Sequence, residues 1–176
     1  MRLAPVLSVA TRLLLGALLA LPPGGVPAHA VDLPKRKSGL WEVTAATPGG
    51  PPAPSSQLCI DAKSDDLARQ LSEGAIECSR QEIRREGETY VIDSVCRLGE
   101  STATTRTRIS GRFDSAYTVD VASTYDPPLF GQREGRATVQ ARWLGPCRPG
   151  QRPGDMTLPG GRTINILDAQ KRAPGK

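Results

Sequence analysis

The strongest constraint on this chain is a period of two in its hydropathy. In "TRTRISGRFDSAYTVDVASTY", residues 105–125, the odd positions carry the large apolar residues and the even positions carry arginine, threonine and aspartate. Successive side chains of a β-strand point to opposite faces, so this pattern predicts strands with one buried face. The apolar face consists of Ile109, Phe113, Tyr117, Val119 and Val121, and the polar face of Arg106, Arg108, Arg112, Thr118 and Asp120.

A turn within this stretch would convert it into a hairpin. A three-residue loop at 114–116 pairs Phe113 with Tyr117 and Ile109 with Val121, which keeps both faces consistent. A two-residue loop would set odd positions against even ones and mix apolar with polar side chains. The sequence therefore predicts the three-residue loop.

The same alternation predicts further strands on both sides of this hairpin. "GLWEVTAA" (39–46) places Trp41, Val43 and Ala45 on one face. "RATVQARWLGPC" (136–147) directs Val139, Ala141 and Trp143 inward, and "RTINIL" (162–167) predicts a short final strand.

One segment predicts a helix. "DAKSDDLARQLSEG" (61–74) has acidic residues in its first turn, apolar Leu67, Ala68 and Leu71, and Gly74 just past its end. The preceding segment, 47–56, is rich in proline and glycine and predicts a loop.

These elements predict a mainly β fold, an antiparallel meander that forms a curved sheet or a partly open barrel, with one short helix and two disulfides. Strands with one apolar face must curl or be covered, which favours curvature. No internal repeat or second domain is evident, so we expect a single domain over 31–170 and a flexible basic tail at 171–176.

Residues 1–30 have the features of a secretory signal peptide. Arg2 and Arg12 give a basic start, and an apolar run occupies only residues 13–21, far short of the roughly 20 residues that span a bilayer. "AHA" (28–30) supplies small residues for cleavage after Ala30. The alternative is an uncleaved membrane anchor, which the short run disfavours. We expect a periplasmic or secreted protein with no stable membrane anchor after cleavage.

The four cysteines, Cys59, Cys78, Cys96 and Cys147, all follow this leader. In an exported chain, an even number of cysteines predicts disulfides. A three-residue loop at 86–88 would place Cys78 opposite Cys96 in a hairpin, where a bridge is reachable. Cys59–Cys147 then follows by elimination.

Several chemistries are disfavoured. The only histidine, His29, lies in the leader, so the exported chain lacks the commonest general base and metal ligand. We therefore expect no metal, no cofactor and no catalysis. A carboxylate pair can still hydrolyse glycosides, and the candidates are Glu42, Asp93, Asp120 and Asp126. We expect Asp120 to form exposed ion pairs with Arg108 and Arg112 instead.

The charge of the chain is modest. Removal of Arg2 and Arg12 lowers the basic side chains from 23 to 21 against 18 acidic ones, and the net charge from +5 to +3. The basic residues are scattered, which argues against a nucleic-acid groove. The arginine rows could meet an anionic glycan or lipid head group, but we expect a solvated face balanced by acidic residues.

Two sets of residues are candidates for binding. Trp41, Phe113, Tyr117 and Trp143 would line the concave face of a half-barrel and could hold an apolar ligand. The simpler alternative is that these aromatic residues only pack in the core.

The second set lies in "YDPPLFGQREG" (125–135), where two prolines stiffen a loop that carries Leu129 and Phe130. We expect this loop to fold over the open end of the sheet and bury both residues. The alternative is a contact with a partner or a lipid at a rigid tip.

Four features occur together: a signal peptide, "KSGLWEVT" (37–44), a cysteine followed by a predicted helix, and a cysteine hairpin with "RWLGPC" (142–147) near the end. This combination resembles the proteobacterial family catalogued as domain of unknown function 3617, small exported proteins with a G-L-W-E motif. The resemblance covers about 36–148 and leaves 149–176 as an addition. It implies periplasmic residence and a mainly β fold, but no substrate, catalytic residue or cofactor.

The sequence thus predicts a non-catalytic, monomeric, exported envelope protein that binds a small apolar or amphiphilic ligand. The alternative is a protein-interaction or inhibitor module that presents the 126–135 loop to a periplasmic protein. A carboxylate-based hydrolase is a third hypothesis.

Overall fold

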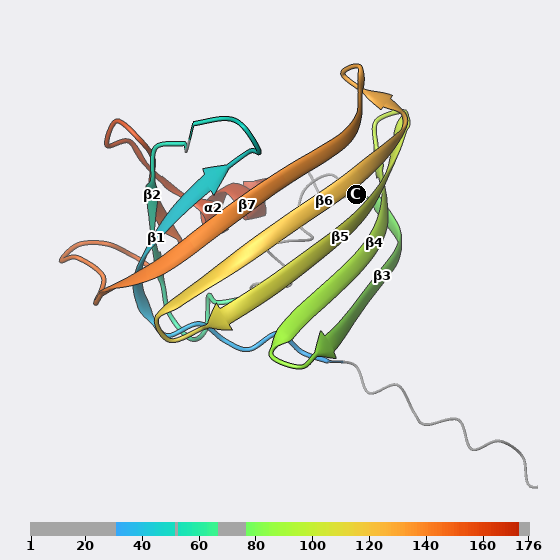
Figure 1. Ribbon diagram of the computed structural model, residues 1–176. Coiled ribbons are helices and arrows are strands. Elements are labelled where there is room, and N and C mark those ends of the chain that lie inside the picture. Colours follow the sequence, from blue (N-terminus) through green and yellow to red (C-terminus); the bar gives the residue numbers. More distant parts are fainter. Residues whose placement is uncertain (1–30, 52, 67–76, 173–176) are drawn as a thin grey trace, which may run out of the picture.

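The alternating segments form one continuous antiparallel sheet. The computed structural model describes residues 31–51, 53–66 and 77–172, which contain nine strands and a short helix (Figure 1). The strands are β1 (Gly39–Ala46), β2 (Ser56–Ile60), β3 (Glu77–Glu86), β4 (Thr89–Leu98), β5 (Ser101–Arg112), β6 (Ala116–Leu129), β7 (Gln132–Gly145), β8 (Asp155–Thr157) and β9 (Thr163–Asn165), and the helix is α2 (Ile166–Arg172).

The strand order is β3-β4-β5-β6-β7-β1-β2-β8-β9. Strands β3 to β7 follow one another as a meander, and β1 pairs with the last of them, β7. Figure 1 shows that the sheet is strongly curved, with β1 and β2 behind β7. The outermost strands β3 and β9 do not pair with each other, so the sheet remains open. The predicted fold class, a curved antiparallel sheet with a short helix and two disulfides, is confirmed.

The curvature lets this single sheet enclose its own core. We call the face that carries the core the inner face and the opposite one the outer face. Each large apolar side chain that is buried contributes about 1.5–3 kcal/mol, so this cluster is the main source of stability. Its members are Trp41, Leu58, Ile60, Ile92, Ile109, Tyr117, Val119 and Ala141.

The β5–β6 hairpin has the predicted loop length at a different place. The three-residue loop is 113–115, so Ile109 is opposite Val119 and Gly111 is opposite Tyr117. The predicted pairs were wrong by two residues, but the two faces are as predicted because the side-chain period is two.

The physical reason lies at Gly111. Its φ is 111°, and a Cβ atom there would lie 2.8 Å from the Cα of Tyr117. Strand β5 therefore needs glycine opposite Tyr117. In this register Phe113 is the first residue of the loop. From there its ring stacks on that of Tyr117, with centroids 5.3 Å apart.

The β3–β4 hairpin contains two deviations that cancel. Its loop is the two residues 87–88, not the predicted three at 86–88. This loop alone would place Cys78 opposite Arg97. A β-bulge at Ser79 adds one residue to β3 and restores the pair Cys78↔Cys96. The predicted loop was wrong, but the predicted pairing of the cysteines is confirmed.

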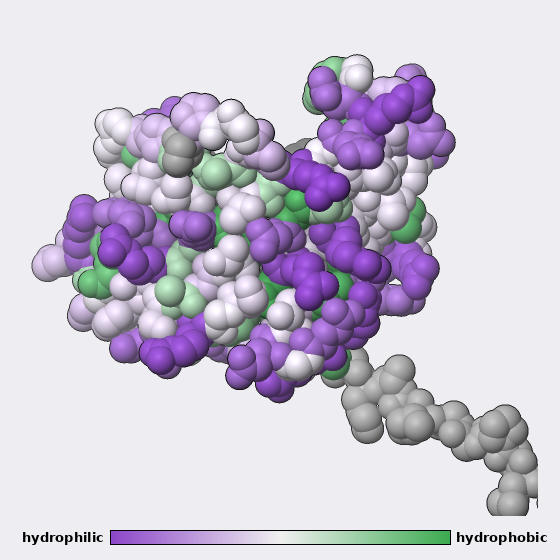
Figure 2. Space-filling model, viewed as in Figure 1, coloured by the Kyte–Doolittle hydropathy of each residue, from purple (hydrophilic) through white to green (hydrophobic). Residues whose placement is uncertain are grey.

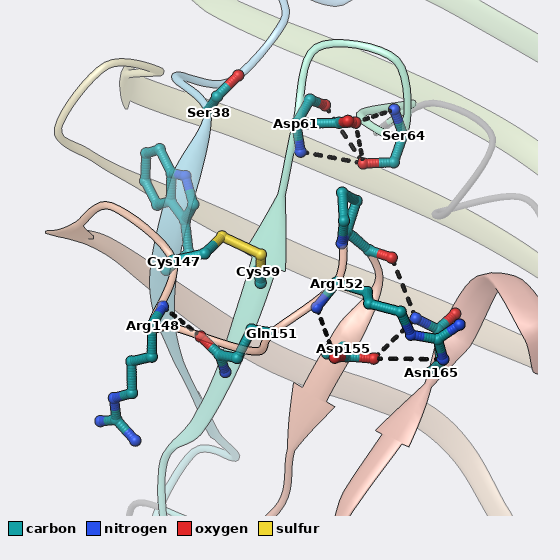
Figure 3. The surroundings of a disulfide bond; sticks show 12 residues. Ser38, Cys59, Asp61, Ser64, Cys147, Arg148, Gln151, Arg152, Asp155 and Asn165 are labelled. Atoms are coloured by element: carbon teal, nitrogen blue, oxygen red, sulfur yellow. Dashed lines mark hydrogen bonds and ion pairs between the residues drawn. A yellow bond between two sulfur atoms is a disulfide. The ribbon is translucent and has the colours of Figure 1, made fainter.

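Both predicted disulfides are present. Cys78–Cys96 joins two residues directly opposite each other on β3 and β4, with Cα atoms 3.9 Å apart. Cys59–Cys147 joins β2 to the segment after β7 and links residues 88 apart in sequence (Figure 3). Two formed disulfides indicate an oxidising, non-cytoplasmic compartment.

The region around the predicted helix differs from expectation. Strand β2 was not predicted, because only Leu58 and Ile60 mark its inner face. Residues 61–66 form a turn, in which the Asp61 Oδ1 accepts a hydrogen bond of 2.7 Å from the Ser64 amide. The remainder of the predicted helix, 67–74, lies outside the described residues.

A helix is present instead near the C-terminus. The strand predicted over 162–167 is only β9, and α2 begins at Ile166. The Asn165 Oδ1 accepts a hydrogen bond of 3.0 Å from the Asp168 amide, so Asn165 is the N-cap that ends the strand and begins the helix. Helix α2 also includes Lys171 and Arg172, which we expected in the tail.

Candidate functional site

The four aromatic residues predicted to line a concave face do lie on the inner face. Trp41 is 0% exposed and Tyr117 is 6% exposed, and their ring centroids lie 5.4 Å apart. Phe113 is half-buried against Tyr117, and Trp143 is opposite Trp41 in the β1–β7 pairing. The rings of Trp41 and Phe113 pack against that of Tyr117, and Trp143 packs against the same core, as the core alternative expects.

The two tryptophans also hold the segment before β1. The Trp41 Nε1 donates to the Lys37 carbonyl at 2.9 Å, and the Trp143 Nε1 donates to the Ser38 carbonyl at 3.1 Å. The Lys37 ammonium lies 3.6 Å from the centroid of the Trp143 ring, a cation–π contact. Both indole N–H groups are thus satisfied by the protein's own backbone.

A buried ion pair completes this end of the core. Arg36 is 5% exposed and Asp65 is 0% exposed, with 2.7 Å between the Arg36 Nη2 and the Asp65 Oδ1. The Arg36 Nη1 also donates to the Tyr117 hydroxyl at 3.1 Å. The pair was not predicted, since "PKRK" (34–37) and "KSDD" (63–66) look like ordinary solvated charges. Arg36 and Asp65 become buried only through tertiary contacts.

Asp93 on the outer face of β4 lies between two arginines. Its Oδ1 accepts from the Arg106 Nε at 2.7 Å, and its Oδ2 accepts from Arg84. The hydrogen bonds from Arg106 and then Arg84 lower the pKa of the Asp93 carboxyl to about 2. A general acid in glycoside hydrolysis needs a raised pKa, so this environment is the opposite of the one required.

The other candidate carboxylates have separate environments. The Glu42 Oε1 accepts from the Arg142 Nη2 at 2.9 Å, and the Asp120 Oδ1 accepts from the Thr138 hydroxyl at 2.7 Å. Asp126 lies on β6 opposite Thr102.

The expected ion pairs of Asp120 were wrong. Arg108 pairs with Glu86 at 3.4 Å and Arg112 with Asp114 at 3.2 Å. Arg108 pairs with Glu86 on β3, and Arg112 pairs with Asp114 in the loop of its own hairpin, so neither pairs with Asp120. In the part of the chain that the structure describes, no three His, Cys, Asp or Glu side chains form a group that could hold a metal ion.

The β6–β7 hairpin ends in a tip that stands away from the rest of the sheet (Figure 1). We define the tip as residues 125–135. Leu129 pairs with Gln132, and Phe130 and Gly131 form the two-residue turn. Phe130 is 96% exposed and Leu129 is half-buried. The expectation that this loop folds over the sheet and buries both residues was wrong, because the strands continue outward to the turn.

The backbone of the turn is unusual for phenylalanine. Phe130 has a φ of 49° and Gly131 a φ of 80°. Two positive φ angles in a two-residue hairpin loop are typical of a type I′ turn, where Asn-Gly is preferred. Phe130 is the only non-glycine residue with positive φ among the described residues.

The tip is braced at its base. Strand β6 remains paired with β5 as far as Asp126. A Cβ atom on Gly135 would lie 2.6 Å from the Tyr125 hydroxyl, so the Tyr125 ring covers the β7 backbone there. Figure 2 shows this tip as a projecting knob with hydrophobic surface beside strongly hydrophilic surface.

No helix in the described part of the chain is long and apolar enough to cross a membrane. The predicted leader, 1–30, lies outside the described residues.

A family model described as "Protein of unknown function (DUF3617)" matches residues 36–147. The matched region contains both disulfides, the aromatic cluster and the tip, and it ends before β8, β9 and α2. No curated protein and no solved structure matches the chain.

Proposed function

Since this chain belongs to the family described as protein of unknown function (DUF3617), with no activity attached to the family, we propose its function from the geometry. We propose that it is a non-catalytic, exported protein-interaction module. It binds another protein of the bacterial envelope by inserting Phe130 at the tip into an apolar pocket of that partner.

The exposure of Phe130 carries this proposal. Its side chain is 96% exposed, whereas the other exposed large apolar residues, Leu144 and Ile164, are 40% and 39% exposed. Burying a phenylalanine side chain is worth about 1.5–3 kcal/mol, so a partner pocket gains that free energy on binding. Aromatic anchors of this kind supply most of the affinity in many protein interfaces.

The backbone supports the same conclusion. A non-glycine residue in the left-handed region costs about 1–2 kcal/mol. The chain accepts this cost at Phe130 although asparagine would fit the turn better. Unfavourable backbone conformations cluster at binding sites, where the surrounding structure holds them.

The rigidity of the tip favours binding further. The β6–β7 register is interrupted between Thr124 and Leu129, but β6 is paired with β5 as far as Asp126 and Leu129 is paired with Gln132, which supports the turn before any partner arrives. A preformed element loses little conformational entropy on association.

The alternative, a cup for an apolar ligand, has less support. Trp41 and Tyr117 would have to contact the ligand, yet both are buried against other protein groups. A membrane contact is also less well supported, because Arg133 and Glu134 flank the turn with opposite charges. Residence in the periplasm or secretion is part of the proposal and agrees with the oxidised cysteines.

The test compares wild-type protein with Phe130→Asn as baits for periplasmic proteins, followed by mass spectrometry of what is captured. Ile164→Asn is the matched control, since it removes an exposed apolar side chain from β9. We expect one captured protein to fall by about tenfold or more with Phe130→Asn, a loss of about 1.4 kcal/mol, and to persist with Ile164→Asn.

The same variant distinguishes lost binding from lost folding. Phe130→Asn removes no buried contact and relieves the backbone cost, so we expect the free energy of unfolding to rise by about 0.5–1 kcal/mol. Equal capture by Phe130→Asn and Ile164→Asn would contradict the proposal.

A further inference from the structure

The outer face carries a row of uncharged polar side chains across four strands. Ser110 on β5 is opposite Thr118 on β6, Thr118 is opposite Gln140 on β7, and Gln140 is opposite Thr44 on β1. We call these four residues the polar row. Neighbouring strands lie about 4.8 Å apart, so the row spans roughly 14 Å.

The polar row lies in a hollow of about 510 Å³. Gly111 and Ala116 line the hollow and raise no large side chain beside the row. At Gly111 the space is required, since a Cβ atom would lie 2.7 Å from the Ala116 carbonyl oxygen. Small-molecule sites occupy about 300–1,000 Å³, so this hollow is of the size of such a site.

The charges of the hollow balance. Arg142 and Glu42 line one side, and they form an ion pair with 2.9 Å between Nη2 and Oε1. A second hollow farther along the face contrasts with it, since its lining contains Arg106, Arg108 and Arg136 but a single acidic residue, Asp120. Arg106 and Arg108 pair with Asp93 and Glu86, which lie outside this lining. The hollow at the polar row therefore has no excess charge to attract an anion.

The chemistry of the polar row points to the class of ligand. Hydroxyl and carboxamide groups donate and accept hydrogen bonds, and Arg142 and Glu42 add a charged donor and acceptor. No side-chain hydrogen bond within the described structure involves the polar groups of Thr44, Thr118 or Gln140. They are therefore available to a ligand that itself both donates and accepts. Figure 2 shows surface of intermediate hydropathy over β6 and β7, bounded by strongly hydrophilic groups.

We propose that this hollow binds a neutral saccharide of about disaccharide size. The sugar hydroxyls pair with the polar row, and the apolar face of one sugar ring lies over Ala116, which is exposed in the lining of the hollow. This site is on a different surface from the tip and does not depend on the proposed protein partner.

The experiment is a titration of the ¹⁵N-labelled protein with N,N′-diacetylchitobiose and with maltose, each to about 20 mM, followed by amide chemical shifts. Weak sugar complexes with Kd in the millimolar range are measurable under these conditions. We expect at least one disaccharide to shift the amides of Thr44, Thr118 and Gln140 in a saturable manner.

Two variants test the contacts. Thr118→Val and Gln140→Leu keep side-chain size but remove hydrogen bonds, each worth about 1 kcal/mol, so each should weaken binding about fivefold. Thr124→Val, on the same face of β6 in a different hollow, should leave the Kd unchanged. The proposal is overturned if neither disaccharide shifts these amides. It is also overturned if Thr118→Val and Gln140→Leu bind as tightly as the wild type.

Discussion

Aromatic residues are few in this chain, and those at positions 41 and 130 lie in opposite environments. Trp41 is fully buried and its indole N–H is bonded to the Lys37 carbonyl. Phe130 is almost fully exposed on a turn whose backbone suits asparagine better. A buried ring whose polar group is hydrogen-bonded stabilises the fold. The free energy of burying an exposed ring, such as that of Phe130, is gained only when a complex forms. This difference is why the proposed function rests on Phe130.

Asp93 makes the clearest pH-dependent contribution of a single residue. Its carboxyl pKa is lowered from 3.8 to about 2 by Arg106 and Arg84, and its side chain is 25% exposed. Because the folded pKa lies below the unfolded one, the stabilisation is present above about pH 4 and is lost as the pH falls towards 2. Partial exposure screens the interaction, so we expect about 1–2 kcal/mol.

Urea unfolding of wild type and Asp93→Asn at pH 7 and pH 2 measures this contribution. The variant should be less stable by about 1–2 kcal/mol at pH 7, with most of the difference gone at pH 2. Asp120→Asn, which removes no ion pair found in the structure, is the control and should cost less at pH 7. A difference for Asp93→Asn that is independent of pH would contradict the assignment.

At the scale of elements, the edge strand β3 is built to resist pairing with another chain. Arginine and glutamate alternate at its even positions 80 to 86, and these charges pair as Arg80–Glu82 and Arg84–Glu86. The bulge at Ser79 interrupts its regular pairing with β4. Charges and bulges on an edge disfavour edge-to-edge association. The disulfide Cys78–Cys96 then fixes the end of this strand to β4.

The two disulfides should differ in their contribution to stability. Cys59–Cys147 closes a loop with a sequence separation of 88, and Cys78–Cys96 one of 18. In the chain-entropy model the longer loop contributes about 1.4 kcal/mol more at 25 °C. We expect the double variant Cys59→Ala/Cys147→Ala to be less stable than Cys78→Ala/Cys96→Ala by at least this amount, since Cys59 is also buried. Equal unfolding midpoints in guanidinium, with equal slopes, would contradict this expectation.

At the scale of the whole molecule, one sheet forms both walls of the core, and the ends of the enclosure are closed by irregular segments. The segment before β1 and the turn after β2 meet through the ion pair of Arg36 and Asp65. The segment after β7 adds β8 beside β2, and Met156 and Ile166 pack against the core. This last part lies beyond the family match, yet it is integrated into the same sheet.

The buried ion pair should be essential to this closure. Asp65→Ala leaves the Arg36 guanidinium buried without its carboxylate, which typically costs about 3–5 kcal/mol. Replacement of both partners by apolar residues, Arg36→Met/Asp65→Leu, should cost less than Asp65→Ala alone, because no charge then remains buried. Unfolding in urea measures both variants. Glu82→Ala, which breaks an exposed pair on β3, is the control and should change stability little.

The sequence by itself determined the features that depend on neighbouring residues. The period of two fixes which side chains face the core whatever the register, so the faces of β5 and β6 were predictable although their pairs were not. The family resemblance and both disulfides were also predictable. Once a hairpin pairs Cys78 with Cys96, Cys59 and Cys147 can pair only with each other. The loop lengths were less predictable, since a bulge such as that at Ser79 leaves no mark in the hydropathy.

Only the tertiary structure decided what is buried and what is exposed at the irregular positions. The burial of Arg36 and Asp65 depends on two segments that meet across the fold. The exposure of Phe130 depends on strands that continue past the edge of the core. The polar row exists only because four strands align Thr44, Ser110, Thr118 and Gln140. Local sequence encodes the direction of a side chain, but the contacts that it meets are set by long-range packing.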